Sequence, residues 1–213
     1  MVSRNQALYH ERMLQVEQQH LWQRYHELNQ LAQKGGVVFV GDSLVEYAPV
    51  TELLSTKVPL YNRGVHGITS QDLLEHLDEA VFELAPSIVF LWIGINDLRE
   101  TSPEESFARL KVLVETIKTK LPETIIYVQM ILPINFETFP RSSTGRNQLT
   151  IQQLNQDLQT LSCQLLPVPE ELYDVFGQLK QELSLDGLHL KVAGYLPLMR
   201  QFQSVLEIGR AHV

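Results

Sequence analysis

The chain has little cysteine and no long apolar run. Cys163 is the only cysteine among 213 residues, so an internal disulfide cannot form and a metal site built on several thiolates is excluded. The longest apolar stretch, residues 88–95, is interrupted by Gly94 and is too short to span a bilayer. Residues 1–14 also lack the apolar segment of a signal peptide. These absences exclude a disulfide scaffold and an integral membrane segment, and they predict a cytoplasmic location.

Positive charge is also scarce. The chain carries 17 Lys plus Arg against 25 Asp plus Glu, a formal net charge of −8, and no Lys/Arg-rich run. An acidic chain repels phosphate backbones, which argues against a nucleic-acid partner. Because 44% of the residues are hydrophobic and 20% are charged, the composition predicts a globular domain with a real core and excludes a disordered chain.

Short β-branched and aromatic runs alternate with helical patterns along the chain. The expected strands are residues 37–40, 60–62, 87–93, 124–131 and 165–168. The expected helices between and after them are residues 70–84, 103–121, 148–165 and 191–207. This alternation predicts an α/β fold, namely a three-layer α/β/α domain over residues 37–207 with a five-stranded parallel sheet. Functional groups of such sheets gather at the carboxyl ends of the strands.

A polar segment without glycine or proline, residues 3–33, precedes the first strand. Its apolar side chains recur at spacings of three, four and seven, which predicts a helix that ends at Lys34-Gly35-Gly36. We interpret residues 1–36 as a helix that packs on the flank of the domain, or in a homodimer contact, rather than as a lid. The last six residues, 208–213, are similar to the translation of a common sequencing adapter, so we interpret them as a non-native tail.

A serine at the mouth of a helix follows the first strand, in the sequence Gly41-Asp42-Ser43-Leu44. Its hydroxyl is expected to be exposed, with the backbone N–H pointing outward at the helix N-terminus. Three interpretations fit these four residues. The serine is a nucleophile, it caps the helix, or the turn cradles an anion such as a flavin phosphate.

Three further motifs follow later strands or lie near the end of the domain. Residues 62–70 form a glycine-containing turn that leads to a helix cap, and residues 94–97, Gly-Ile-Asn-Asp, are typical of a turn. Asp186 and His189 are three positions apart around a glycine, so the carboxylate can hold one imidazole nitrogen while the other faces a nucleophile. Each motif alone also fits a turn or a surface pair. Together they supply a nucleophile, oxyanion donors, a base and a group that orients the base.

With these motifs the sequence resembles the SGNH subgroup of the GDSL lipase/acylhydrolase family, over residues 37–207 and in the family's block order. The resemblance implies a flavodoxin-like sheet and a catalytic triad in which Ser43 is the nucleophile, His189 the base and Asp186 the residue that orients it. The strand 124–131 and the Leu-Pro exit after it also resemble the branch near platelet-activating factor acetylhydrolase catalytic subunits.

The same resemblance implies an oxyanion hole. Its donors are the backbone N–H groups of Ser43 and Gly67 and the side chain of Asn96, with the glycine of the second block falling on Gly67 rather than Gly64. His66 stands where relatives often carry a small residue. It either touches substrate or faces solvent from the loop.

The implied activity is a serine esterase or acylhydrolase that cleaves short-chain, acetyl-type esters through an acyl-enzyme, with no metal and no organic cofactor. The partner is then a small-molecule acyl ester. A carbohydrate deacetylase and a thioesterase use the same residues, and a non-catalytic flavodoxin-like binding module is a further alternative. The loop 135–145 is long enough to border the pocket, where Phe136, Phe139 and Arg141 either meet the substrate or pack on the surface.

Overall fold

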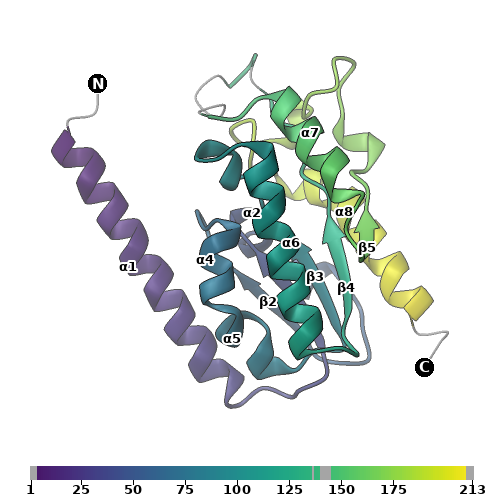
Figure 1. Cartoon of the computed structure of the whole chain (residues 1–213). Coiled ribbons are helices and arrows are strands. Elements are labelled where there is room, and N and C mark those ends of the chain that lie inside the picture. Colours follow the sequence, from purple (N-terminus) through teal and green to yellow (C-terminus); the bar gives the residue numbers. More distant parts are fainter. Residues whose placement is uncertain (1–3, 136, 140–144, 210–213) are drawn as a thin grey trace.

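The computed structural model describes residues 4–135, 137–139 and 145–209 as three layers, with a sheet between helices on its two faces (Figure 1). All five strands are parallel and lie in the order β2-β1-β3-β4-β5. Their bounds are β1 (Val37–Gly41), β2 (Leu60–Gly64), β3 (Ile88–Trp92), β4 (Ile125–Gln129) and β5 (Gln164–Leu166). The predicted α/β class with a five-stranded parallel sheet is confirmed.

Helices connect these strands and precede the first of them. Their bounds are α1 (Arg4–Asn29), α2 (Ser43–Glu46), α3 (Val50–Leu53), α4 (Ser70–Glu75), α5 (Leu77–Ala80), α6 (Pro103–Lys120), α7 (Gln148–Leu158) and α8 (Val192–Gly209). Short 3-10 turns include η1 (Phe82–Leu84), η2 (Asp97–Arg99), η4 (Glu170–Leu172) and η5 (Gln181–Leu183). Of the short elements, α2 is the helix expected at Ser43 after the first strand, whereas η2, which follows the end of β3 after four intervening residues, was not predicted.

The core is centred on β1 and β3, whose residues are apolar and almost fully buried, as expected for inner strands of a parallel sheet. Phe39 of β1 stacks on Phe90 of β3 with ring centroids 4.4 Å apart, and Phe202 of α8 contacts both rings. Burial of each large side chain contributes roughly 1.5–3 kcal/mol. This packing fixes β1 against β3, and with them the two loops that leave their carboxyl ends.

The single helix expected over residues 70–84 is wrong. The segment is divided into α4, α5 and η1 because His76 (φ −117°, ψ 23°) and Val81 (φ −137°, ψ −56°) leave helical geometry. Trp22 of α1 stacks on the His76 ring at a centroid distance of 4.6 Å. The first break, at His76, therefore coincides with a tertiary contact to α1. The local sequence pattern of residues 70–84 could not predict that contact.

The helix expected over residues 148–165 is too long. It ends at Leu158, because Gln164–Leu166 turns back and pairs with β4 as an edge strand. Of the apolar residues in that stretch, Ile151, Leu154 and Leu158 form the buried face of α7, while Leu165 belongs to β5. The helices expected over 3–33 and 191–207 correspond to α1 and α8 with shifted ends.

The C-terminal half of α1 packs on the flank of the domain through buried polar contacts. The Tyr25 hydroxyl donates to the Gly64 carbonyl at 2.6 Å, and Asn29 Nδ2 donates to the Glu79 carbonyl at 2.7 Å. The buried Arg63 guanidinium donates to Asn29 Oδ1 from Nε at 3.2 Å and from Nη2 at 2.8 Å. These contacts tie α1 to β2 and to α5.

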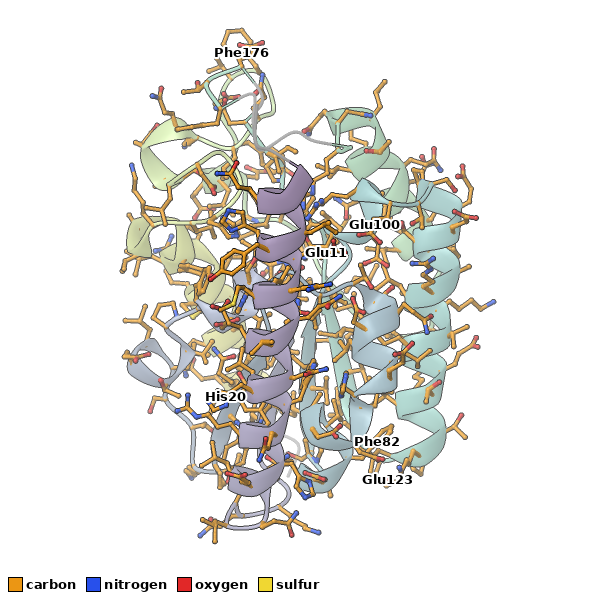
Figure 2. The ribbon with its side chains drawn as sticks, turned by 90° about the vertical axis from the view of Figure 1, so that its left-hand side faces the viewer. Glu11, His20, Phe82, Glu100, Glu123 and Phe176 are labelled. Carbon is orange, nitrogen blue, oxygen red and sulfur yellow. The ribbon has the colours of Figure 1, made fainter. Side chains whose placement is uncertain are left out.

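The N-terminal half of α1 continues toward the carboxyl edge of the sheet (Figure 1). Figure 2 views the molecule with α1 in front, and its labelled Glu11 and His20 are exposed. Leu8 and Tyr9 are also exposed, by 47% and 62%. The outer face of this half-helix is therefore open, while its inner face approaches the loops at the strand ends.

The domain limits 1–36 and 37–207, the non-native tail and the homodimer contact stay predictions. Residues 210–213 lie outside the described part of the chain, and α8 continues two residues beyond the expected end of the domain. Within the described ranges, none of the helices is both long and apolar enough to cross a membrane.

Candidate active site

Ser43 lies directly beyond the end of β1, as the first residue of α2. Asp42 is the residue that caps the helix, because its Oδ1 accepts a hydrogen bond from the Leu44 N–H at 2.9 Å. The interpretation of Ser43 as the helix cap is therefore wrong. Its side chain is free of that role, and the residue is 7% exposed at the carboxyl edge of the sheet.

His189 faces Ser43 across the sheet edge. Ser43 Oγ lies 2.9 Å from His189 Nε2, and His189 Nδ1 lies 2.7 Å from Asp186 Oδ2. Asp186 Oδ1 also accepts from the backbone N–H groups of Leu188 at 3.0 Å and of His189 at 2.8 Å. Partial burial opposes the Asp186 charge, but the side-chain and backbone bonds from His189 outweigh it and lower the pKa of this carboxyl. Ser43 is thus bonded in series with His189 and Asp186, although Ser43 and His189 are 146 positions apart in sequence.

Asn96 and Asp97 leave the end of β3 and bond to the loop after β2. Asn96 Nδ2 donates to the Ile68 carbonyl at 2.9 Å. Asp97 accepts from the Ser70 N–H at 2.9 Å and from the Ser70 hydroxyl. These bonds run between loops, so a local turn does not account for the two side chains. They join the Asn96 loop to the Gly67 loop.

Gly67 occupies the turn next to Ile68 with a left-handed backbone, φ +76°. A Cβ at this position would lie 3.3 Å from the Leu14 methyl groups and from Gln18 Nε2, both of α1. The left-handed backbone favours glycine here, and a Cβ would also press on the side-chain ends of Leu14 and Gln18. The structure thus brings Gly67, Asn96 and Ser43 to the ends of three adjacent strands.

His66 is held by carboxylates. Glu46 Oε2 lies 2.5 Å from the His66 backbone nitrogen and 2.8 Å from its Nδ1, while Glu17 Oε2 lies 3.3 Å from Nε2. Gln18 Nε2 donates to the His66 carbonyl at 2.8 Å. The ring is bound between α2 and α1, so it is not a free loop histidine. Sequence reasoning missed Glu46 and Gln18, although Glu46 lies one helical turn after Ser43.

Asp42 is a fully buried acid beside Ser43. Among the described residues its Oδ2 atom has no hydrogen-bond partner. Burial raises its pKa to about 7, the Leu44 N–H and the Arg146 charge oppose that rise, and the nearby Asp97 adds to it. The carboxyl before the nucleophile is therefore neutral over much of the acidic range.

Arg146 is a second residue that sequence reasoning missed. Its guanidinium is buried and reaches the loop after β3, where Nη2 donates to Asn96 Oδ1 at 2.7 Å. A signal was present in the sequence, because Arg146 immediately precedes the cap of α7, where a cation interacts unfavourably with the helix dipole. An arginine at such a position has its partner elsewhere.

The loop 135–145 borders the Asp186–His189 segment. The Asn135 N–H donates to the Gly187 carbonyl at 2.9 Å, and the half-buried Phe139 lies against Gly187. Phe136 and Arg141 lie outside the described residues. Whether the aromatic side chains contact substrate stays a prediction.

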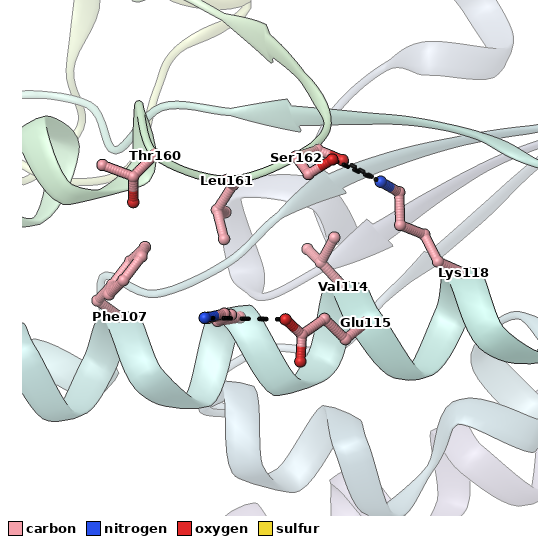
Figure 3. Close-up of a pocket in the computed structure, with 8 residues that line it drawn as sticks. Phe107, Val114, Glu115, Lys118, Thr160, Leu161 and Ser162 are labelled. Carbon is pink, nitrogen blue, oxygen red and sulfur yellow. Dashed lines mark hydrogen bonds and ion pairs between the residues drawn. The ribbon is translucent and has the colours of Figure 1, made fainter.

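A separate cavity of about 500 Å³ opens between α6 and residues 160–162 (Figure 3). Phe107, Val114 and Leu161 supply its apolar walls, and Lys118 donates to the Ser162 carbonyl at its rim. None of its lining residues belongs to the serine–histidine–aspartate cluster. Within the described ranges, no three His, Cys, Asp or Glu residues are placed to hold a metal ion.

A parallel α/β/α sheet with serine, histidine and aspartate bonded in series at its carboxyl edge is typical of hydrolases that act on acyl groups. A model of the GDSL-like lipase/acylhydrolase family matches residues 39–196. The chain therefore belongs to the GDSL-like lipase/acylhydrolase family, as the motifs predict. Members of this family are hydrolases that act on esters, so the chain is such an enzyme and the binding-module alternative is wrong.

Individual proteins of known name or known structure are also similar to this chain. Platelet-activating factor acetylhydrolase IB subunit alpha2 of Rattus norvegicus is 27% identical over 175 residues, which cover 80% of this chain and 75% of that protein. A solved structure from Streptococcus pneumonia with the provisional name platelet activating factor is 33% identical. The match covers 96% of this chain and 100% of that chain, with a TM-score of 0.88. An acetylxylan esterase from Geobacillus stearothermophilus, at 20% identity, 82% and 95% coverage and a TM-score of 0.61, shares the fold.

Proposed function

We propose that the chain is a serine esterase that cleaves short-chain, acetyl-type acyl esters through an acyl-enzyme intermediate. The observation that carries this proposal is the series of contacts from Asp186 through His189 to Ser43, at 2.7 Å and 2.9 Å. A serine hydroxyl is a poor nucleophile until a base takes its proton, and His189 Nε2 lies within transfer distance of Ser43 Oγ.

In the proposed first step Ser43 Oγ attacks the ester carbonyl carbon while its proton passes to His189 Nε2. The carbonyl electron pair moves to oxygen, and the oxyanion accepts hydrogen bonds from the Ser43 and Gly67 N–H groups and from Asn96 Nδ2. Asn96 Nδ2 carries two protons, so it can serve the oxyanion while it remains bonded to Ile68. Collapse restores the carbonyl and breaks the bond to the alcohol oxygen, which takes the proton from His189.

Water then repeats these steps on the acyl-enzyme. His189 takes a proton from the water as its oxygen attacks the acyl carbon, and it returns that proton to Ser43 Oγ as the acid leaves. Asp186 accepts the Nδ1–H bond throughout, so it keeps the imidazole in the tautomer whose Nε2 lone pair faces Ser43 and stabilises the charged form.

The preference for acetyl groups is supported by the name of the rat relative, an acetylhydrolase. Among acetyl, butanoyl, octanoyl and dodecanoyl esters of one alcohol, we expect kcat/KM to be highest for acetyl and to fall with chain length. A maximum at octanoyl or dodecanoyl would contradict this preference. Acetylated sugars and acyl thioesters of matched acyl groups belong in the same panel, since a deacetylase or thioesterase would use the same residues and differ only in the leaving group.

The test of the mechanism is labelling with a serine-directed fluorophosphonate followed by mapping of the modified peptide. We expect a single modification at Ser43 in the folded protein, because its hydroxyl is bonded to an activating base, His189. Heat-denatured protein is the matched control, since it has the same serines without the contact to His189. Modification elsewhere, or no reaction in the folded protein, would contradict the assignment of Ser43.

Asn96→Ala is expected to lower kcat about 10²- to 10³-fold, because one donor to the developing negative charge is removed. Asn155→Ala is the matched control. Asn155 exchanges hydrogen bonds of 2.8 Å with both backbone groups of Ile131, so its loss should lower stability and leave kcat within a few-fold. Ester hydrolysis under saturating substrate measures both, and an unchanged rate in Asn96→Ala would remove Asn96 from the oxyanion hole.

The proposed partner is a small-molecule acyl ester. We also propose a cytoplasmic location, which is expected from the single cysteine, and a homodimer contact through α1. A sedimentation experiment on the full chain tests the second of these.

A further inference from the structure

Arg146 is a buried cation in contact with the Asn96 loop. It is 8% exposed, and its guanidinium donates there from Nη2 to Asn96 Oδ1 at 2.7 Å and from Nε to the Ile95 carbonyl at 2.8 Å. The acceptors belong to neighbouring residues just beyond β3. The planar guanidinium therefore holds this segment at two points, which a lysine ammonium could not do with the same geometry.

The contacts of Asn96 are compatible with only one orientation of its carboxamide. A half-turn about the last side-chain bond exchanges the positions of Oδ1 and Nδ2. Oδ1 only accepts hydrogen bonds, and Nδ2 only donates them. Arg146 offers donors alone, and the Ile68 carbonyl offers an acceptor alone. The flipped amide would place N–H against guanidinium and oxygen against oxygen. Arg146 and Ile68 thus determine where the second Nδ2 proton points.

The chain path to Arg146 is also specific. Gly145 has φ +73°, and a Cβ there would lie 2.8 Å from the Arg99 backbone, so the chain passes directly over η2. Asn147 then caps α7, with its side chain accepting from the Thr150 N–H at 2.9 Å. Burial and the charge of Arg99 lower the pKa of Arg146 to about 10, which shows the cost of holding a cation here. Helix stability gains nothing from that cation.

We propose that Arg146 is a positioning residue of the oxyanion hole: it fixes the orientation of the Asn96 carboxamide and polarises it, so that Nδ2 donates to the developing negative charge. The charge on Arg146 draws electron density toward Oδ1 and strengthens the opposite N–H donor. This inference rests on the proposed function, and in particular on Asn96 as an oxyanion donor.

The test is a double-mutant cycle with Arg146→Gln, Asn96→Ala and the two together. Because Arg146 acts through Asn96, Arg146→Gln alone is expected to lower kcat about 10- to 100-fold with little change in KM. In the Asn96→Ala background the same change should cost less than about threefold in kcat. Full additivity of the two losses would overturn the inference, since a residue that acts independently contributes the same amount in either background.

Two single variants separate orientation from charge. Arg146→Lys keeps the charge and loses the second contact, so its kcat should lie between those of wild type and Arg146→Gln. Arg99→Gln removes an exposed neighbouring charge and should leave kcat unchanged. Equal losses in Arg99→Gln and Arg146→Gln would show a general field effect and overturn the inference. Circular dichroism and thermal unfolding establish which variants fold, and Arg146→Lys carries the cycle if Arg146→Gln does not.

Failure of this inference differs from failure of the proposed function. If Asn96→Ala loses activity on the expected scale while Arg146→Gln and Arg146→Lys keep wild-type kcat, Arg146 has no positioning role and the oxyanion assignment stands. If Asn96→Ala itself keeps wild-type kcat, the oxyanion assignment fails and the inference fails with it.

Discussion

Ser43→Ala is expected to lower kcat for ester hydrolysis about 10⁶-fold, the largest effect of any single substitution in this chain. The reason is geometric, because Ser43 Oγ is the atom that forms the acyl bond and the hydroxyl that His189 Nε2 deprotonates at 2.9 Å. Alanine leaves the remaining groups in place, so binding of substrate should persist. Initial rates with saturating acetyl ester, and KM or a competitive inhibition constant, measure the two quantities separately.

Ser204→Ala is the matched control, since Ser204 is an exposed serine of α8. We expect its kcat to equal that of the wild type. Thermal unfolding of both variants should remain close to wild type, because neither serine supports the core. Wild-type turnover in Ser43→Ala would refute the whole mechanism, whatever the substrate.

Asp186→Asn is expected to lower kcat about 10⁴-fold with the fold intact. The carboxamide oxygen can still accept from the Leu188 and His189 backbone N–H groups, so the turn is kept. The amide nitrogen, however, donates where Oδ2 accepted from His189 Nδ1. The imidazole must then carry its proton on Nε2, where it faces Ser43 and cannot act as a base.

Asp174 offers a matched control for the Asp186→Asn variant. Asp174 Oδ1 also accepts two backbone N–H groups, those of Phe176 and Gln178, each at 2.9 Å, in a turn without a histidine contact. Asp174→Asn should therefore leave kcat unchanged. If Asp186→Asn retains more than a tenth of wild-type kcat, Asp186 does not orient the base.

The sheet, the three motifs after strand ends and the Asp186–His189 pair were predictable because each depends on local signals. Val37–Gly41 and Ile88–Trp92 are short continuous apolar runs rich in β-branched and aromatic residues, which is typical of a strand covered on both faces. Parallel strands place their carboxyl ends at one edge, so residues as distant as Ser43 and His189 could be expected to meet. The family resemblance then supplied the pairing of roles, which spacing alone leaves open.

The missed residues act through long-range contacts, and no local pattern identifies the partner in such a contact. Gln18 reaches His66 across 48 positions, and Arg146 reaches Asn96 across 50. The break at His76 has the same origin, because it is occupied by Trp22 of α1. In each case a side chain from one element meets a loop or break in another, so the local sequence does not identify the partner. For Arg146 it shows only a cation placed unfavourably before the cap of α7.

The buried carboxyl of Asp42 couples the folding equilibrium to proton binding. Its pKa is about 7 in the folded protein against an ordinary value of 3.8, so between these values the native state holds a proton that the unfolded chain releases. The free energy of unfolding contributed by this group is fully present below about pH 4 and is lost as pH rises to about 7. The slope is at most about 1.4 kcal/mol per pH unit.

Asp42→Asn isolates this contribution, because asparagine can still accept from the Leu44 N–H but does not titrate. Urea unfolding at a series of pH values should show wild-type stability declining relative to the variant between pH 5 and 7, then running parallel above pH 8. A constant difference would show that Asp42 stays ionised throughout. If the decline is found, the alkaline limit of this enzyme's stability is determined in part by the residue next to its nucleophile.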